Sequence, residues 1–268
     1  MSYPHTVLKI PAKTARVPYR SGIGILLFLA GMYSVQAQEQ SAQREDGWRF
    51  QLTPYVWFSA LEGDVRPFQG APSAHVAKSF SELWSNLDAA AFITGTARRD
   101  RLVLQADFSH ARSSDSATLP IGLPVNAKVR QTSATFTAGY NLIPSDRSSI
   151  DVMAGLRSWK IQADVEAPPL LEAGSKSSFI DPVFAARWRQ QVAPRWSTLL
   201  YADVGGFGVG SESTWQLLGT VNYQARDNLH LSLGYRKLAV DYRDRGRRLD
   251  FSMGGPLLGV TWLFGKHR

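Results

Sequence analysis

The chain closes with the stretch FSMGGPLLGVTWLFGKHR, from Phe251 to Arg268. Between Phe251 and Phe264 this stretch contains no Lys, Arg, Asp or Glu. It is too short and too rich in glycine for a membrane-spanning helix, which needs about 20 apolar residues. Every second residue from Pro256 to Phe264 reads Pro, Leu, Val, Trp, Phe, so the larger side chains fall on one face of an extended chain. The pattern predicts a β-strand whose apolar face ends in two aromatic residues.

The N-terminus has the composition of a secretory signal peptide. Residues 1–20 contain four basic and no acidic side chains, residues 22–35 form an apolar run, and Val35-Gln36-Ala37 is a small-x-small site. We expect residues 1–37 to be removed; the alternative is an N-terminal membrane anchor, for which a run of about 14 residues is short. Because removal takes four basic residues and no acid, the formal charge falls from +8 to +4.

The remaining composition excludes several classes of protein. The chain has no cysteine, so it has neither a disulfide framework nor a cysteine metal site. An exported chain with a formal charge of +4 gives little support to nucleic-acid binding, and we expect no nucleic acid among its partners. No group of His, Asp and Glu has the spacing of metal ligands, so we expect no metal and no cofactor.

Ten runs of about 10–14 residues with alternating character follow the N-terminal segment, as expected of strands. They cover residues 48–59, 89–98, 102–111, 128–140, 150–162, 178–191, 195–207, 213–224, 229–242 and 249–264. Tight turns such as VAPR at 192–195 alternate with mostly longer loops. The longest loops are expected at 60–88, with a helical turn at 80–87, and at 112–127 and 163–177. Short turns at one end and longer loops at the other are typical of an outer-membrane β-barrel.

The pattern therefore predicts an all-β fold. We expect a closed antiparallel up-and-down transmembrane β-barrel of about ten strands; eight or twelve strands also fit. The expected order along the chain is a signal peptide (1–37), a short periplasmic segment (38–47), the barrel (48–264) and a C-terminal tail (265–268). The expected location is the bacterial outer membrane.

Alternation by itself also fits a soluble barrel with its apolar face inward. Two features favour lipid outside. Charged residues in mid-strand share one face, and the opposite faces carry Leu, Val, Ala and Phe, which suit hydrocarbon. Aromatic residues gather toward strand ends, as in the girdles of a membrane barrel. These are Trp48, Tyr140, Trp159, Trp188, Trp196, Tyr223, Tyr242 and Trp262.

Four stretches resemble a family of small outer-membrane β-barrel proteins of Gram-negative bacteria, usually described as porin-family proteins. They are GWRFQLTPYVWFSALEGDV, FSELWSNLDAAAF, ADVGGFGVGSESTWQLLGTVNYQ and LGYRKLAVDYRDRGRRLDFSMGGPLLGVTWLF, and the resemblance covers about residues 47–264. It implies an outer-membrane barrel without transferable catalytic residues. It also implies a barrel-assembly signal at Trp262 and Phe264, although GKHR follows Phe264 here. The implied partners are outer-membrane lipid and the barrel-assembly machinery.

A ten-stranded barrel lies near the size whose interior is filled by side chains. We expect a network of Arg and Asp in the lumen, because unpaired buried charge is costly. The candidates are Arg49, Tyr55, Asp107, Arg157, Asp181, Arg187, Asp203 and Arg236. Such a network either holds the barrel rigid or lines a narrow pore. The predicted function is therefore structural, or that of a narrow porin-like channel for small solutes.

Two other functions remain open. An outer-membrane enzyme acting on lipid or peptide would use a rim site, for which His110 with Ser109, Ser113 and Asp115 is the one candidate. We expect no enzyme, because such residues are common in a polar loop. A soluble periplasmic ligand-binding barrel is the third alternative. GGFGVG at 205–210 lacks the context of a phosphate loop, and its glycines are interpreted as a bend or turn.

The last outer loop, DYRDRGRR, is rich in arginine. Arg243, Arg245, Arg247 and Arg248 lie within six residues, with Asp241 and Asp244 nearby. Guanidinium groups bind phosphate in a bidentate manner. We therefore expect this hairpin to contact lipopolysaccharide, with a solvated hairpin tip as the alternative.

Overall fold

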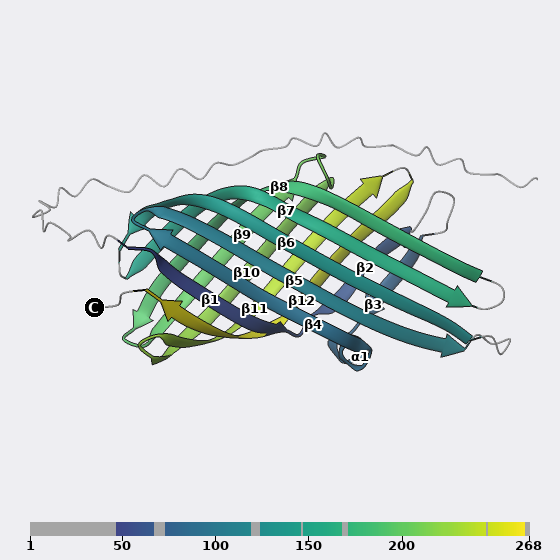
Figure 1. The fold of residues 1–268 in the computed structure, drawn as a ribbon, viewed down its shortest axis with the longest axis horizontal. Coiled ribbons are helices and arrows are strands. Elements are labelled where there is room, and N and C mark those ends of the chain that lie inside the picture. Colours follow the sequence, from purple (N-terminus) through teal and green to yellow (C-terminus); the bar gives the residue numbers. More distant parts are fainter. Residues whose placement is uncertain are drawn as a thin grey trace, which may run out of the picture. The chain divides into compact units, whose positions relative to one another are not determined.

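The computed structural model describes residues 47–66, 73–118, 124–145, 147–167, 171–244 and 246–265. The expected signal peptide, nearly all of segment 38–47 and the end of the tail lie outside these residues. The described chain is almost entirely strand (Figure 1). Its elements are β1 (Arg49–Trp57), β2 (Ala60–Arg66), β3 (Ala74–Lys78), α1 (Phe80–Ser85), β4 (Leu87–Arg99), β5 (Leu102–Thr118), β6 (Pro124–Pro144), β7 (Ser148–Ala167), β8 (Leu171–Ala193), β9 (Trp196–Gly206), β10 (Ser213–Arg226), β11 (Leu229–Asp244) and β12 (Arg247–Phe264).

Ten of the strands close into an antiparallel barrel. Strands β4 to β12 pair in sequence order, and β1 pairs with both β4 and β12. Phe50 of β1 lies opposite Ala97 on one side and Phe264 on the other. Closure leaves β1 and β12 without a free edge where they pair, as the interior of a bilayer requires. The expected fold class is confirmed, and the C-terminal strand β12 closes the wall by pairing with β1.

The wall is extended by a hairpin where a loop was expected. β1 pairs with the half of β12 near Phe264, and β2 continues along β12 from the pair Ala60–Gly254 outward. β3 then pairs with β2. The expected loop at 60–88 is therefore wrong for β2 and β3, because β2 pairs with the long β12 and β3 pairs with β2.

The expected helical turn in this segment is confirmed as α1. Ser79 caps it in a capping box: the Glu82 backbone N–H donates to the Ser79 hydroxyl at 3.4 Å, and the Ser79 backbone N–H donates to Glu82 Oε2 at 2.7 Å. Phe80 and Trp84 pack on Phe58, with ring centroids 5.1 and 6.2 Å away. No helix among the described residues is long and apolar enough to cross a membrane.

Strands β6, β7 and β8 are 21, 20 and 23 residues long, about twice the 9–11 that a tilted strand needs to cross a bilayer (Figure 1). The expected loops at 112–127 and 163–177 are therefore wrong over their described residues. Their outward faces are polar, for example at Arg112, Asp164 and Glu166, so they lack the apolar outward face of a transmembrane strand. They are strands because pairing continues outward, for example between Lys128 and Asp164.

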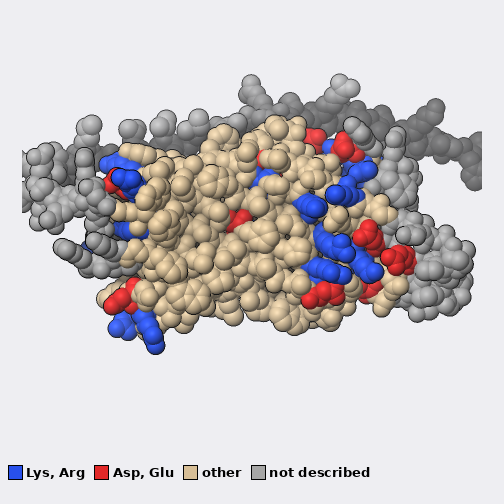
Figure 2. Space-filling model, viewed as in Figure 1, with Lys and Arg blue, Asp and Glu red and all other residues tan. Residues whose placement is uncertain are grey.

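The outward face of the barrel is apolar over a broad band. On the face shown in Figure 2, most Lys, Arg, Asp and Glu side chains lie toward the two ends of the barrel. The exposed side chains of the band include Phe136, Leu156, Ile180, Phe184, Leu200, Leu217, Leu233 and Leu258. Tyr140, Trp188, Trp196 and Trp262 are also exposed. Trp159 and Tyr242 are buried, so placing these two in a girdle was wrong: they share the inward faces of Arg157 and Arg236.

The outer half of the lumen is filled by an apolar core. Its buried members are Trp57, Trp159, Phe179, Leu238, Val240, Tyr242, Phe251, Met253 and Leu257. Phe179 of β8 stacks on Tyr242 of β11 with ring centroids 4.2 Å apart, and Trp159 meets Phe251 edge to face. We call these nine residues the lumen core. Because they come from five strands around the wall, they tie its opposite sides together.

Candidate functional site

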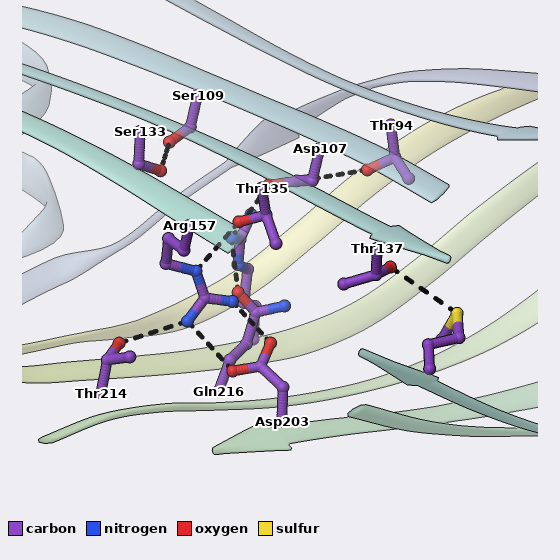
Figure 3. A network of polar contacts seen from close by, with 12 residues as sticks. Thr94, Asp107, Ser109, Ser133, Thr135, Thr137, Arg157, Asp203, Thr214 and Gln216 are labelled. Carbon is purple, nitrogen blue, oxygen red and sulfur yellow. Dashed lines mark hydrogen bonds and ion pairs between the residues drawn. The ribbon is translucent and has the colours of Figure 1, made fainter. Parts of the chain in front are cut away.

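Below the lumen core, an arginine–carboxylate pair crosses the interior. Arg157 of β7 donates from Nη1 to Asp203 Oδ1 at 3.0 Å and from Nη2 to Oδ2 at 2.5 Å (Figure 3). Its Nε donates to Thr135 at 2.9 Å, and Nη1 reaches Thr214 at 3.2 Å. Both charged side chains are almost fully buried. This bidentate geometry is the strong form of the pair, and hydroxyl groups satisfy further guanidinium donors.

A second group joins five strands around Arg236 of β11. Arg236 donates to the Tyr55 hydroxyl, to Asp107 Oδ1 at 3.2 Å and to Gln216 Oε1 at 2.6 Å. Asp107 also accepts from Tyr55 at 3.1 Å and from Thr94 at 2.6 Å. The guanidinium lies 4.7 Å from the ring centroid of Trp57, a cation–π contact with the lumen core above it. Polar network and apolar core are thus one continuous filling.

A third group, nearer the short turns, is built on Asp151. Arg98 reaches its two oxygens at 3.1 and 2.5 Å, and Arg187 Nε donates to Oδ2 at 2.8 Å. Asn141 adds a bond of 2.7 Å. Neither Asp151 nor Arg98 was among the residues that we selected from the sequence. The signal for Asp151 was present, since it lies six residues before Arg157 and so on the same face of its strand.

Two sequence-selected residues lie apart from these groups. Arg49 is exposed at the turn end of β1. Asp181 is buried, and it accepts from the Ser211 backbone N–H at 2.7 Å and from the Ser211 hydroxyl at 2.9 Å. It thereby fixes the loop between β9 and β10. That loop turns through Gly206 and Gly208, with φ of 89° and 74°, so the interpretation of these glycines as a turn is confirmed.

A cavity of about 200 Å³ lies between the polar groups and the turn end of the barrel. At its inner end it is lined by Tyr55, Arg157 and Arg236, and at the turn end by Gln51 and Leu263. This volume is large enough to hold several water molecules. The lumen therefore has two unlike halves, a cavity with room for several water molecules toward the turns and a packed apolar core toward the loops.

The residues of the rim-enzyme alternative do not form a catalytic arrangement. Ser109 points inward and bonds the Ser133 hydroxyl at 2.8 Å (Figure 3), whereas His110 points outward and bonds Thr132 at 2.9 Å. Ser113 donates to the Asn86 carbonyl, and Asp115 pairs with Lys78 at 3.2 Å. Neighbouring residues of a strand face opposite sides of the wall, which separates this serine from this histidine. The described residues contain no group of three or more His, Asp or Glu that would hold a metal ion.

The described arginines of the last outer hairpin, Arg243, Arg247 and Arg248, are already engaged. Arg243 binds Asp241 at 3.1 and 2.7 Å, and Arg248 binds Asp250 at 2.8 Å. Arg247 donates to the Lys176 carbonyl at 3.0 Å. Arg245 lies outside the described residues. At the other end of β12, Trp262 and Phe264, the expected assembly signal, face outward.

Comparison with known proteins identifies the fold. The chain matches no protein-family model and no curated protein in sequence. Among solved structures it is similar to the outer membrane protease OmpT of Escherichia coli, with a TM-score of 0.50, 9% identity and coverage of 82% of this chain and 97% of that one. It is also similar to the translocator domain of the autotransporter NalP of Neisseria meningitidis, with a TM-score of 0.46, 12% identity and coverage of 83% of this chain and 90% of that one. For Ail, the attachment invasion locus protein of Yersinia pestis, the TM-score is 0.37 and the identity 9%, with coverage of 82% of this chain and 99% of that one. The fold is that of outer-membrane β-barrel proteins.

Proposed function

We propose that this chain is an integral protein of the bacterial outer membrane whose barrel serves as a closed structural element. Three features support membrane insertion: the wall closes on itself, its outward face is an apolar band, and its mid-barrel charges lie inside. A soluble barrel would reverse the two faces. The fold shared with OmpT agrees with this location.

The packed lumen core is the observation that supports a barrel closed to ions. Hydrated ions crossing the barrel would have to pass between Phe179, Tyr242 and Phe251, which are packed against one another and their neighbours. Exposing a large apolar side chain costs about 1.5–3 kcal/mol. A path that displaces two of them costs about 3–6 kcal/mol, which holds the open fraction below about 1%. The barrel is therefore a rigid body held by internal ion pairs.

A narrow channel is the second candidate, because the cavity of about 200 Å³ already accounts for the turn-end half of a path. Movement of the lumen core would complete it. We do not propose catalysis, since the one serine–histidine candidate is split between the two faces of β5.

Two measurements test these proposals. The full chain, expressed in a Gram-negative host, should fractionate with the outer membrane and show heat-dependent mobility in SDS gels. In planar bilayers, the wild-type barrel should show no discrete conductance steps. A variant with Phe179→Ala and Phe251→Ala should conduct, whereas the lipid-facing control with Phe108→Ala and Phe136→Ala should not. Steady wild-type conductance would replace the closed-barrel proposal with the narrow channel, and a soluble protein without a heat shift would contradict membrane insertion.

A further inference from the structure

The outward face of β6, β7 and β8 carries three cations just beyond the apolar band. Arg130, Gln162 and Lys176 lie opposite one another across the three strands, and Thr132, Lys160 and Ser178 form the next row inward. Neighbouring strands lie about 4.8 Å apart and alternate residues about 6.7 Å apart, so the three cationic residues are spaced by roughly 8–10 Å. We call Arg130, Lys160 and Lys176 the β6–β8 patch.

The cations of the β6–β8 patch differ from two outward cations nearby on β5 and β6, Arg112 and Lys128, which are paired. Among the described residues, their side chains make no ion pair and no hydrogen bond. Elsewhere on this face, Arg112 pairs with Asp88 at 3.4 Å and Lys128 with Glu166 at 3.7 Å. Lys160 and Lys176 are exposed and Arg130 is half-buried. The patch therefore presents positive charge without an internal counter-ion.

The position of the patch matches the boundary between hydrocarbon and headgroups. Ile180 follows directly inward, and Phe136 and Leu156 form the row after it. These three side chains are 54–56% exposed. Asp164 lies one row farther out, beside Gly174, and bounds the patch on its outer side. An amphiphile lying here would have its acyl chains over the apolar rows and its headgroup among the cations.

We propose that Arg130, Lys160 and Lys176 form a binding site for the phosphorylated glycolipid of the outer leaflet, the lipid A part of lipopolysaccharide. The proposal rests on the proposed outer-membrane location. Arg130 supplies a fork that matches phosphate oxygens, and the two lysines supply point charges on long, flexible stems. The site replaces the expected contact at the last outer hairpin, where Arg243 and Arg248 are engaged by their own aspartates.

The test compares two triple variants of the full chain purified in detergent. One carries Arg130→Gln, Lys160→Gln and Lys176→Gln; the matched control carries Arg243→Gln, Arg247→Gln and Arg248→Gln. Native mass spectrometry would measure binding of purified lipid A, of the same lipid after dephosphorylation, and of inorganic phosphate. We expect lipid A to bind the patch variant at least tenfold more weakly than wild type and the control within twofold. Dephosphorylated lipid should bind wild type as weakly as lipid A binds the patch variant.

Each contrary result has a distinct meaning. Equal lipid A binding by wild type and patch variant would overturn the site, and an equal loss in both variants would reduce it to general charge attraction. Inorganic phosphate binding as tightly as lipid A would indicate a phosphate site without a lipid component and would also overturn it. The heat shift in SDS is measured on the same samples. Its absence in wild type contradicts the proposed function, whereas intact barrels with unchanged lipid binding contradict only the lipid site.

Discussion

Replacing Asp203 with Asn should destabilise the barrel far more than an equivalent change on the surface. The substitution keeps the size of the side chain but removes the charge that faces Arg157, whose guanidinium is 2% exposed. The two bonds at 3.0 and 2.5 Å lose their charged acceptor, and the other hydrogen-bond partners of the guanidinium, Thr135 and Thr214, are neutral hydroxyl groups. Removing one partner of a buried pair costs about 3–5 kcal/mol, because the other charge stays buried.

The assay is urea unfolding of the barrel refolded in lipid vesicles, followed by tryptophan fluorescence. Asp241→Asn is the matched control, because its partner Arg243 is 53% exposed and an exposed pair contributes about 1 kcal/mol or less. A double variant, Arg157→Met with Asp203→Leu, should recover most of the loss, since apolar residues often replace a buried pair without cost. The reasoning is refuted if Asp203→Asn costs no more than Asp241→Asn, or if the double variant is less stable than the single one.

Three further predictions concern other parts of the chain. Gly155→Ala should prevent normal pairing of β6 and β7, because the added methyl group would lie 1.9 Å from the Phe136 carbonyl oxygen. At Gly95 the nearest atom to an added methyl group is 3.9 Å away, so Gly95→Ala should fold normally. The yield of heat-shifted protein in SDS gels distinguishes the two variants. Phe264→Ala should lower the amount of barrel assembled in cells if Phe264 is part of the assembly signal, whereas Phe136→Ala should not; normal assembly of Phe264→Ala would remove that role. Hydrogen bonds from the Ser79 hydroxyl and backbone N–H hold the pKa of Glu82 below its ordinary value of 4.5. The capping box should therefore stabilise α1 fully above that ordinary value and lose its effect as pH falls through the lowered pKa, which amide exchange of α1 compared with Ser79→Ala would show.

The inside and outside of the strands were readable because the side-chain period of a strand is local. Arg157, Asp203 and Arg236 lie inside, as their alternation with apolar residues predicted. The same rule would have assigned Trp159 to the lumen, since it is two residues from Arg157. Interpreting it as a girdle residue gave weight to its place near a strand end rather than to its face.

The partners within the lumen depended on the register of strands far apart in the sequence. Arg157 lies opposite Asp181 on the neighbouring β8, yet its guanidinium binds Asp203 one strand farther on, while Asp181 holds the loop at Ser211. The sequence gives no reason to choose Asp203 over Asp181 as the partner of Arg157. The tilt and closure of the wall set which oxygens come within reach.

From the sequence alone followed the all-β class, the approximate strand number and the inward placement of charge, because each depends on alternation along a single strand. Only the tertiary structure showed that β6–β8 extend outward, that an apolar core fills one half of the lumen, and that unpaired cations gather beyond the apolar band on those strands. These features depend on which residues of different strands face one another. That relation is set by pairing register and barrel closure, and no single stretch of the chain determines either of them.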